Sequence, residues 1–222
     1  MFKKIAAVFI LFLGVVFFII AKTEKKDVVH MPPKYRAEGF DGKDSIYHRV
    51  PDIALVNQMG DAVTMNASLS NRIVVINFFF SNCTTICTPL MQNMATLQKA
   101  FHRTAVKQND TIAQLVSISV DQARDSFPAL RQYANSLGAD HDRWWLCTGD
   151  GAAIRNYARN ELKVIAPEAA GEVGDLFHTK TIVVLDKQRR IRGYYNGLDT
   201  AEIMRCADDI GKLYIEKERK RR

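Results

Sequence analysis

The chain has few cysteines, no internal repeat and no low-complexity tract. Four cysteines among 222 residues are too few and too unevenly spaced to form a disulfide scaffold in a domain of this size. At 47% apolar residues, the chain is long enough to bury one sizeable core and too short for two comfortable ones. We therefore expect one globular domain with appendages.

The middle of the chain also lacks net charge. The formal charge of +7 at first suggests a nucleic-acid binder, but the basic groups gather at the two ends, in residues 1–27 and 212–222. These ends account for the whole excess, so residues 28–211 have no overall field that attracts phosphates. The charge distribution argues against nucleic acid as a partner.

One long uncharged apolar run is present, at residues 5–21. As a helix it would be about 25 Å long, close to a bilayer core of about 30 Å, and the flanking lysines can extend its reach. The alternative is a cleaved signal peptide, which usually ends in an Ala-x-Ala-like site, whereas Ile19 and Ile20 precede Ala21 here. We predict a transmembrane anchor over residues 1–21.

The sequence after the anchor divides into three parts. Residues 22–50 are polar and contain Pro32-Pro33, which favours a stalk that holds the domain off the bilayer. We expect the domain to span residues 51–216. The basic residues 217–222 are expected to form a solvated, frayed tail.

Within the domain, strand patterns alternate with helix patterns. Residues 73–80 form an unbroken apolar, β-branched run, typical of a central strand buried on both faces. The other expected elements are a hairpin of 53–56 and 62–65, a helix with an apolar stripe at Leu90, Met94, Leu97 and Phe101, a strand at 115–120, a helix that ends at Gly138, a strand at 144–147, a short helix capped by Asp150, a hairpin of 181–186 and 191–195, and a last helix from about Thr200. This order predicts an α/β domain with a mixed sheet flanked by helices, and the thioredoxin-like arrangement is the leading candidate.

The chemistry is concentrated in Cys83 and Cys87, which lie where the buried strand ends and a helix begins. Their i, i+4 spacing can bring both thiols to one helix face. A helix N-terminus favours the thiolate, which is both a redox nucleophile and a soft ligand suited to Cu(I). A redox pair, a metal site and a structural pair all remain open. Cys147 and Cys206 are expected to be small buried apolar residues.

A metal bound by two thiolates needs a further ligand, and His178 is the candidate among five histidines. It follows a glycine-containing stretch and immediately precedes a strand, so we expect it on a loop anchored to a rigid element. His30 falls in the expected stalk, and His48, His102 and His141 fall at expected exposed ends of elements. A lone histidine is more often structural, so the residues alone leave its role open.

Two weaker candidates accompany these ligands. Met91, four residues after Cys87, could offer a thioether, but it neighbours the apolar stripe and we expect it to pack in the core or at its rim. Asp175 could orient the His178 imidazole, but we expect a solvated loop residue.

The order of the segments resembles the Sco (SenC) family of copper chaperones across about residues 50–205. The matching segments are the hairpin that begins at Val50, Cys83-x-x-x-Cys87, Ser119-Val-Asp121 with Arg124-Asp125, Thr148-Gly149, and His178 ahead of the strand at 181–186. The resemblance implies a thioredoxin-like fold and a Cys2His copper site made of Cys83, Cys87 and His178, for Cu(I) and as a second candidate Cu(II). It further implies an N-terminal membrane anchor, a domain in the periplasm or mitochondrial intermembrane space, and a role in assembling the binuclear copper site of cytochrome c oxidase.

Two classes of function follow. The first is a metallochaperone that passes copper to the copper-bearing oxidase subunit or to another thiol or copper protein. The second is an enzyme, a thiol–disulfide reductase with Cys83 and Cys87 as its redox pair, although the chain lacks the usual Cys-x-x-Cys spacing. A peroxidase is a third and weaker alternative, because Thr84-x-x-Cys87 resembles the peroxiredoxin motif but Cys83 stands where that family has proline.

Overall fold

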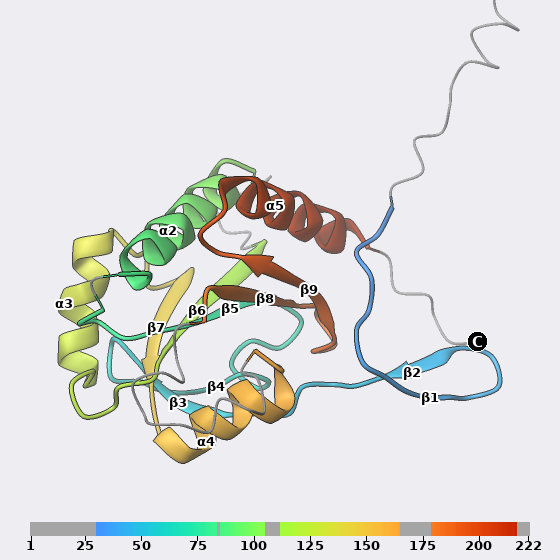
Figure 1. The fold of residues 1–222 in the computed structure, drawn as a ribbon, viewed down its shortest axis with the longest axis horizontal. Coiled ribbons are helices and arrows are strands. Elements are labelled where there is room, and N and C mark those ends of the chain that lie inside the picture. The colour runs from blue at the N-terminus through green and yellow to red at the C-terminus, as the bar shows by residue number, and fades with distance from the viewer. Residues whose placement is uncertain (1–29, 84, 105–111, 165–178, 217–222) are drawn as a thin grey trace, which may run out of the picture. The chain divides into compact units, whose positions relative to one another are not determined.

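The computed structural model describes residues 30–83, 85–104, 112–164 and 179–216, with the side chains of residues 102–104 excepted (Figure 1). The chain divides into two units, Met1–His30 and Met31–Arg222. All the described helices and strands belong to the second unit. Within the described residues, no helix is long and apolar enough to cross a bilayer. The anchor predicted for residues 1–21 lies outside them.

A seven-stranded mixed sheet forms the centre of the second unit, with the strand order β4-β3-β7-β6-β5-β8-β9. The strands are β3 (Ala54–Asn57), β4 (Ala62–Thr64), β5 (Ile73–Phe79), β6 (Ala113–Ser119), β7 (Trp144–Thr148), β8 (Thr181–Leu185) and β9 (Ile191–Asn196). The three central strands β5, β6 and β7 are parallel, and both neighbouring pairs are antiparallel hairpins. Both predicted hairpins are confirmed.

Helices cover both faces of the sheet. They are α2 (Cys87–Thr104), α3 (Phe127–Leu137), α4 (Gly151–Asn156), the π-helix η1 (Tyr157–Glu161) and α5 (Thr200–Ile215). Apolar side chains of α2, α3 and α5 pack on one face, and those of α4 and η1 pack on the other. In Figure 1, α2 and α5 therefore lie above the sheet and α4 lies below it. The predicted α/β architecture is confirmed.

Local signals in the sequence position these elements. Every residue of β5 is buried, as its apolar run predicts for a strand covered on both faces. The predicted stripe of α2 is buried in the core. Helix α3 ends at Gly138, which adopts the left-handed conformation (φ 66°) that glycine tolerates best. The Asp150 carboxylate accepts a hydrogen bond from the Ala153 amide and caps α4 as expected.

The segment interpreted as a stalk through residue 50 makes contacts with the domain from Pro32 onward. The Arg192 guanidinium, 1% exposed, donates to the carbonyl oxygens of Pro32 (2.7 Å) and Pro33 (3.1 Å). Further along, the Val50 amide donates to the Arg189 carbonyl at 2.9 Å. The compact unit therefore begins at Met31 rather than near residue 51. The polar composition of residues 22–50 did not reveal that part of this segment packs on the domain, because backbone carbonyls of any sequence can satisfy a buried guanidinium.

Residues 31–50 also contain a two-stranded hairpin that the sequence did not predict. Strand β1 (Ala37–Phe40) pairs with β2 (Ser45–Tyr47), and the pair forms its own small sheet. The turn is closed by the Asp41 carboxylate, which accepts hydrogen bonds from the amides of Lys43 and Asp44. The hairpin lacks the apolar alternation expected of a strand because its side chains are almost all exposed.

Candidate metal centre

The two cysteines of the predicted site lie together at the end of β5. After the strand, the Cys83 amide donates to the Phe80 carbonyl at 3.2 Å and closes a tight turn. Helix α2 then begins at Cys87, whose backbone N–H donates to the Cys83 Sγ at 3.4 Å. Both thiols are free and buried, with 6% of Cys83 and 2% of Cys87 exposed. The structure therefore brings the two sulfurs to one helix N-terminus.

The surroundings of the two thiols make them chemically unequal. Burial raises the pKa of Cys83, but the hydrogen bonds it accepts from Cys87 and Thr85 outweigh burial and lower this pKa to about 7. For Cys87, burial raises the pKa to about 12, and its hydrogen bond to Cys83 acts in the same direction. At neutral pH, Cys83 is therefore the thiolate-forming member of the pair and Cys87 remains a thiol.

An aromatic pair borders the thiols. The ring of Tyr133 on α3 stacks on Phe79, the last residue of β5, with centroids 5.7 Å apart and planes at 11°. Burial, together with the nearby charges of Cys87 and Cys83, raises the pKa of Tyr133 to about 12. The phenol is therefore neutral at physiological pH, and sequence reasoning did not identify it as a neighbour of the site.

The Met91 thioether belongs to the core, as expected. Its Sδ accepts a hydrogen bond from the Asn77 side-chain amide at 3.5 Å. The Asn77 carbonyl oxygen accepts from the Ser117 hydroxyl at 2.6 Å, and the Trp144 indole N–H donates to the same hydroxyl oxygen at 2.9 Å. All four residues are fully buried. Met91 belongs to the same core cluster as Cys83 and Cys87.

His178, the predicted third ligand, lies outside the described residues, as does Asp175. The chain can be followed again from Thr179. Since β8 runs antiparallel to β5, with Ile76 opposite Val183, its first residue Thr181 lies at the end of the sheet where β5 leads to the cysteines. Strand β8 therefore starts at the same end of the sheet as the two thiols.

The described histidines lie elsewhere. His48 was expected to be exposed, but its ring nitrogens contact the carboxylates of Glu38 (2.6 Å) and Glu161 (2.9 Å), and only 15% of its side chain is exposed. His141 is exposed as predicted and lies 3.2 Å from Asp142. In the part of the chain that the structure describes, no group of three or more histidine, cysteine or acidic side chains could hold a metal ion.

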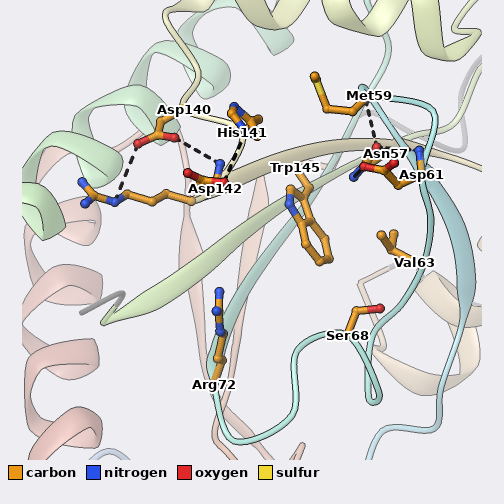
Figure 2. A pocket seen from close by; sticks show the side chains of 11 residues that line it. Asn57, Met59, Asp61, Val63, Ser68, Arg72, Asp140, His141, Asp142 and Trp145 are labelled. Atoms are coloured by element: carbon orange, nitrogen blue, oxygen red, sulfur yellow. Dashed lines mark hydrogen bonds and ion pairs between the residues drawn. The ribbon is translucent and has the colours of Figure 1, made fainter. Parts of the chain in front are cut away.

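A hollow of about 540 Å³ lies over β3, β4 and β7 (Figure 2). The Trp145 indole occupies its middle, between Met59 at one end and Arg72 at the other. Its lining carries charges of both signs, including the acidic Asp61 and the basic Arg72. Because no cysteine lines this hollow, it is separate from the candidate metal centre.

The SCO1/SenC family model matches residues 46–213. A SCO1 protein homolog of Bacillus subtilis is 27% identical over 169 residues, which are 76% of this chain and 84% of that protein. Among solved structures, BsSco, described as having a disulfide switch and as a member of the Sco family of cytochrome c oxidase assembly proteins, has a TM-score of 0.65 at 24% identity and covers 79% of this chain and 98% of its own. Bradyrhizobium japonicum ScoI with copper bound has a TM-score of 0.56 at 24% identity, covering 75% and 99%.

The structural similarity confirms the predicted thioredoxin-like arrangement, a sheet flanked by helices. The family match begins before the hairpin of β3 and β4, includes the cysteine pair and all the later described strands, and ends within α5. The chain belongs to the SCO1/SenC family.

Proposed function

We propose that this chain is a copper metallochaperone that assists assembly of the binuclear copper site of cytochrome c oxidase, with Cys83, Cys87 and His178 as the copper ligands. The observation that carries the proposal is the pair of free thiols at the start of α2, one of which has a pKa lowered to about 7. Soft thiolates are the ligands that Cu(I) prefers. Sco proteins of other organisms have been solved with copper bound, which supports copper as the cargo.

The unequal thiols suit a site that must both bind and release its cargo. At neutral pH about half of the Cys83 side chains are already thiolates that can take up a soft cation, whereas nearly every Cys87 must release a proton on binding. Binding is therefore coupled to pH, and protonation of Cys87 favours release to an acceptor. The acceptor is the copper-bearing subunit of the oxidase or another thiol or copper protein, which takes the ion by ligand exchange.

The assignment of His178 depends on the position of β8. The Lys180 carbonyl accepts a hydrogen bond from the Gly197 amide, and a Cβ on Gly197 would lie 2.1 Å from the Leu90 Cδ1 of α2. The chain two residues after His178 is thus near the first turn of the helix that carries Cys87. An imidazole ligand supplied from this end of β8 would complete a Cys2His set.

The apolar run at residues 5–21 supports a membrane anchor for this domain. We place the anchored domain on the extracytoplasmic side, in a periplasm-like space or the mitochondrial intermembrane space.

A second candidate function is thiol–disulfide exchange on the cysteines of a partner. The same unequal pair favours it, because a thiolate near neutral pH is the attacking nucleophile and a buried neutral thiol can resolve the mixed disulfide. The two functions use the same sulfurs and differ in whether copper or electrons are transferred.

Copper titration of the full-length, reduced chain tests the proposal. We expect one tightly held copper per chain and, after oxidation to Cu(II), a thiolate-to-copper charge-transfer band. His178→Ala should weaken binding and shift this band. His141→Ala is the matched control, because His141 is an exposed histidine whose described partner is Asp142. Absence of tight copper together with a readily reduced Cys83–Cys87 disulfide would reject the metallochaperone in favour of thiol–disulfide exchange.

A further inference from the structure

Asp125 is a fully buried carboxylate close to the cysteine pair, and neither proposed function accounts for it. It is 0% exposed, and none of the ion pairs among the described residues includes it. Burying a carboxylate without a cation is costly unless hydrogen-bond donors surround it. Its position therefore requires specific partners.

Three donors surround this carboxylate, and they come from the ends of two neighbouring parallel strands. The backbone N–H of Ser81 donates to Oδ2 at 3.1 Å, and the Ser81 hydroxyl donates to Oδ1. The hydroxyl of Ser119, the last residue of β6, donates to Oδ2. Asp125 thus links Ser81, two residues beyond the end of β5, to the end of β6.

The loop that carries Asp125 is itself fixed. Its amide donates to the Asp121 carbonyl at 2.9 Å, and the Asp121 amide donates to the Ser119 hydroxyl at 3.1 Å. The pairing of the two strands continues beyond β6, where the Val120 amide donates to the Phe79 carbonyl at 2.9 Å. The carboxylate is therefore held on a rigid base.

The fixed end of β5 leads directly into the cysteine turn. Ser81 lies two residues before Cys83 and within the turn closed by the Cys83 amide and the Phe80 carbonyl. We propose that Asp125 is a positioning residue that acts through Ser81 and holds this turn so that the Cys83 and Cys87 sulfurs remain within reach of each other. The inference rests on the proposed function of the pair, whether its work is copper binding or thiol exchange.

Such positioning should change the equilibrium constant for forming the internal Cys83–Cys87 disulfide in exchange with an external thiol. In a glutathione buffer, the Cys83–Cys87 disulfide reacts with two glutathione thiols to give the dithiol and oxidised glutathione. Holding the two thiols close raises their effective concentration and so favours the internal disulfide. Loosening the turn should shift the equilibrium towards the dithiol.

A double-mutant cycle on the full-length, copper-free chain tests this. The variants are Ser81→Ala, Asp125→Asn and the double variant, and the fraction of the dithiol is read by alkylation and mass spectrometry of the peptide that holds both cysteines. We expect each single change to lower the equilibrium constant for disulfide formation about ten-fold, since each removes a hydrogen bond involving a charged group. The equilibrium constant of the double variant should be no lower than that of the single variant with the larger effect, because both changes break the same connection.

Ser68→Ala is the matched control. The Ser68 hydroxyl takes part in a hydrogen bond as well, as the acceptor from the Thr64 backbone amide at 3.0 Å, but at the far edge of the sheet. It should leave the equilibrium constant unchanged. Asp125→Asn was chosen over alanine because the amide keeps the size of the side chain and one acceptor oxygen, and thermal unfolding checks that each variant folds.

Two results would overturn the inference. Effects that multiply in the double variant would mean that Asp125 does not act through Ser81. A lower melting temperature with an unchanged equilibrium constant would mean that the carboxylate only stabilises the fold. Because the assay contains no copper, either result leaves the metallochaperone proposal standing, and a failure to bind copper would leave the cycle interpretable.

Discussion

The unequal acidity of the two thiols predicts their reactivity towards an alkylating agent. At pH 7, Cys83, with a pKa of about 7, should be about half thiolate, whereas Cys87, with a pKa of about 12, should be ionised in only about one molecule in 10⁵. Because the thiolate is the reacting form, iodoacetamide should modify Cys83 first, and its rate should rise through a midpoint near pH 7.

The assay is a time course of iodoacetamide labelling on the full-length, reduced, copper-free chain between pH 5 and 9, read by peptide mass spectrometry. Cys147 and Cys206 are internal controls: burial raises the pKa of both, and both are 0% exposed, so they should remain unlabelled while the chain is folded. Thr85→Val removes one donor to Cys83 and should move its midpoint upward. A midpoint near the ordinary 9.0, or earlier labelling of Cys87, would refute the reasoning.

Three further predictions concern stability, each measured by urea unfolding of the reduced chain. The folded-state pKa of Cys83 lies below its ordinary value, so the stability that this thiolate contributes is present above pH 9 and is lost as the pH falls through about 7. The free energy of unfolding should therefore rise by about 2–3 kcal/mol between pH 7 and pH 9, and Cys83→Ser should remove this rise. Arg192→Met should cost about 3 kcal/mol, because the buried Arg192 contacts Asp186 and Glu216 and its loss leaves carboxylates under-compensated. Asp150→Ala should cost about 1 kcal/mol through the lost helix cap; no measurable change would contradict that role.

Several elements could be predicted because their signals are local. The apolar run of β5 and the stripe of α2 mark buried faces directly, and Gly138 and Asp150 mark helix ends by their own conformations and side chains. The hairpin of β1 and β2 could not be predicted in this way. Its strands carry no apolar face, and its base is fastened by long-range contacts such as that between His48 and Glu161.

The sequence by itself determined that Cys83 and Cys87 stand at a strand-to-helix boundary, because a buried strand and an amphipathic helix each have a recognisable period. It did not determine which sulfur is the acidic one. That difference arises from the Cys87 backbone N–H aimed at Cys83 and from the deeper burial of Cys87, both of which depend on the packed position of α2.

Tertiary structure alone also decided the partners of the buried polar groups. Ser81 and Asp125 are 44 residues apart, and Arg192 reaches Pro32 across 160 residues. Composition and spacing contain no information on such pairs, since any donor can serve any acceptor and only the register of the folded strands selects which ones meet. The sequence therefore determined the elements and the reactive residues, and the folded sheet determined the hydrogen bonds that hold those residues in place.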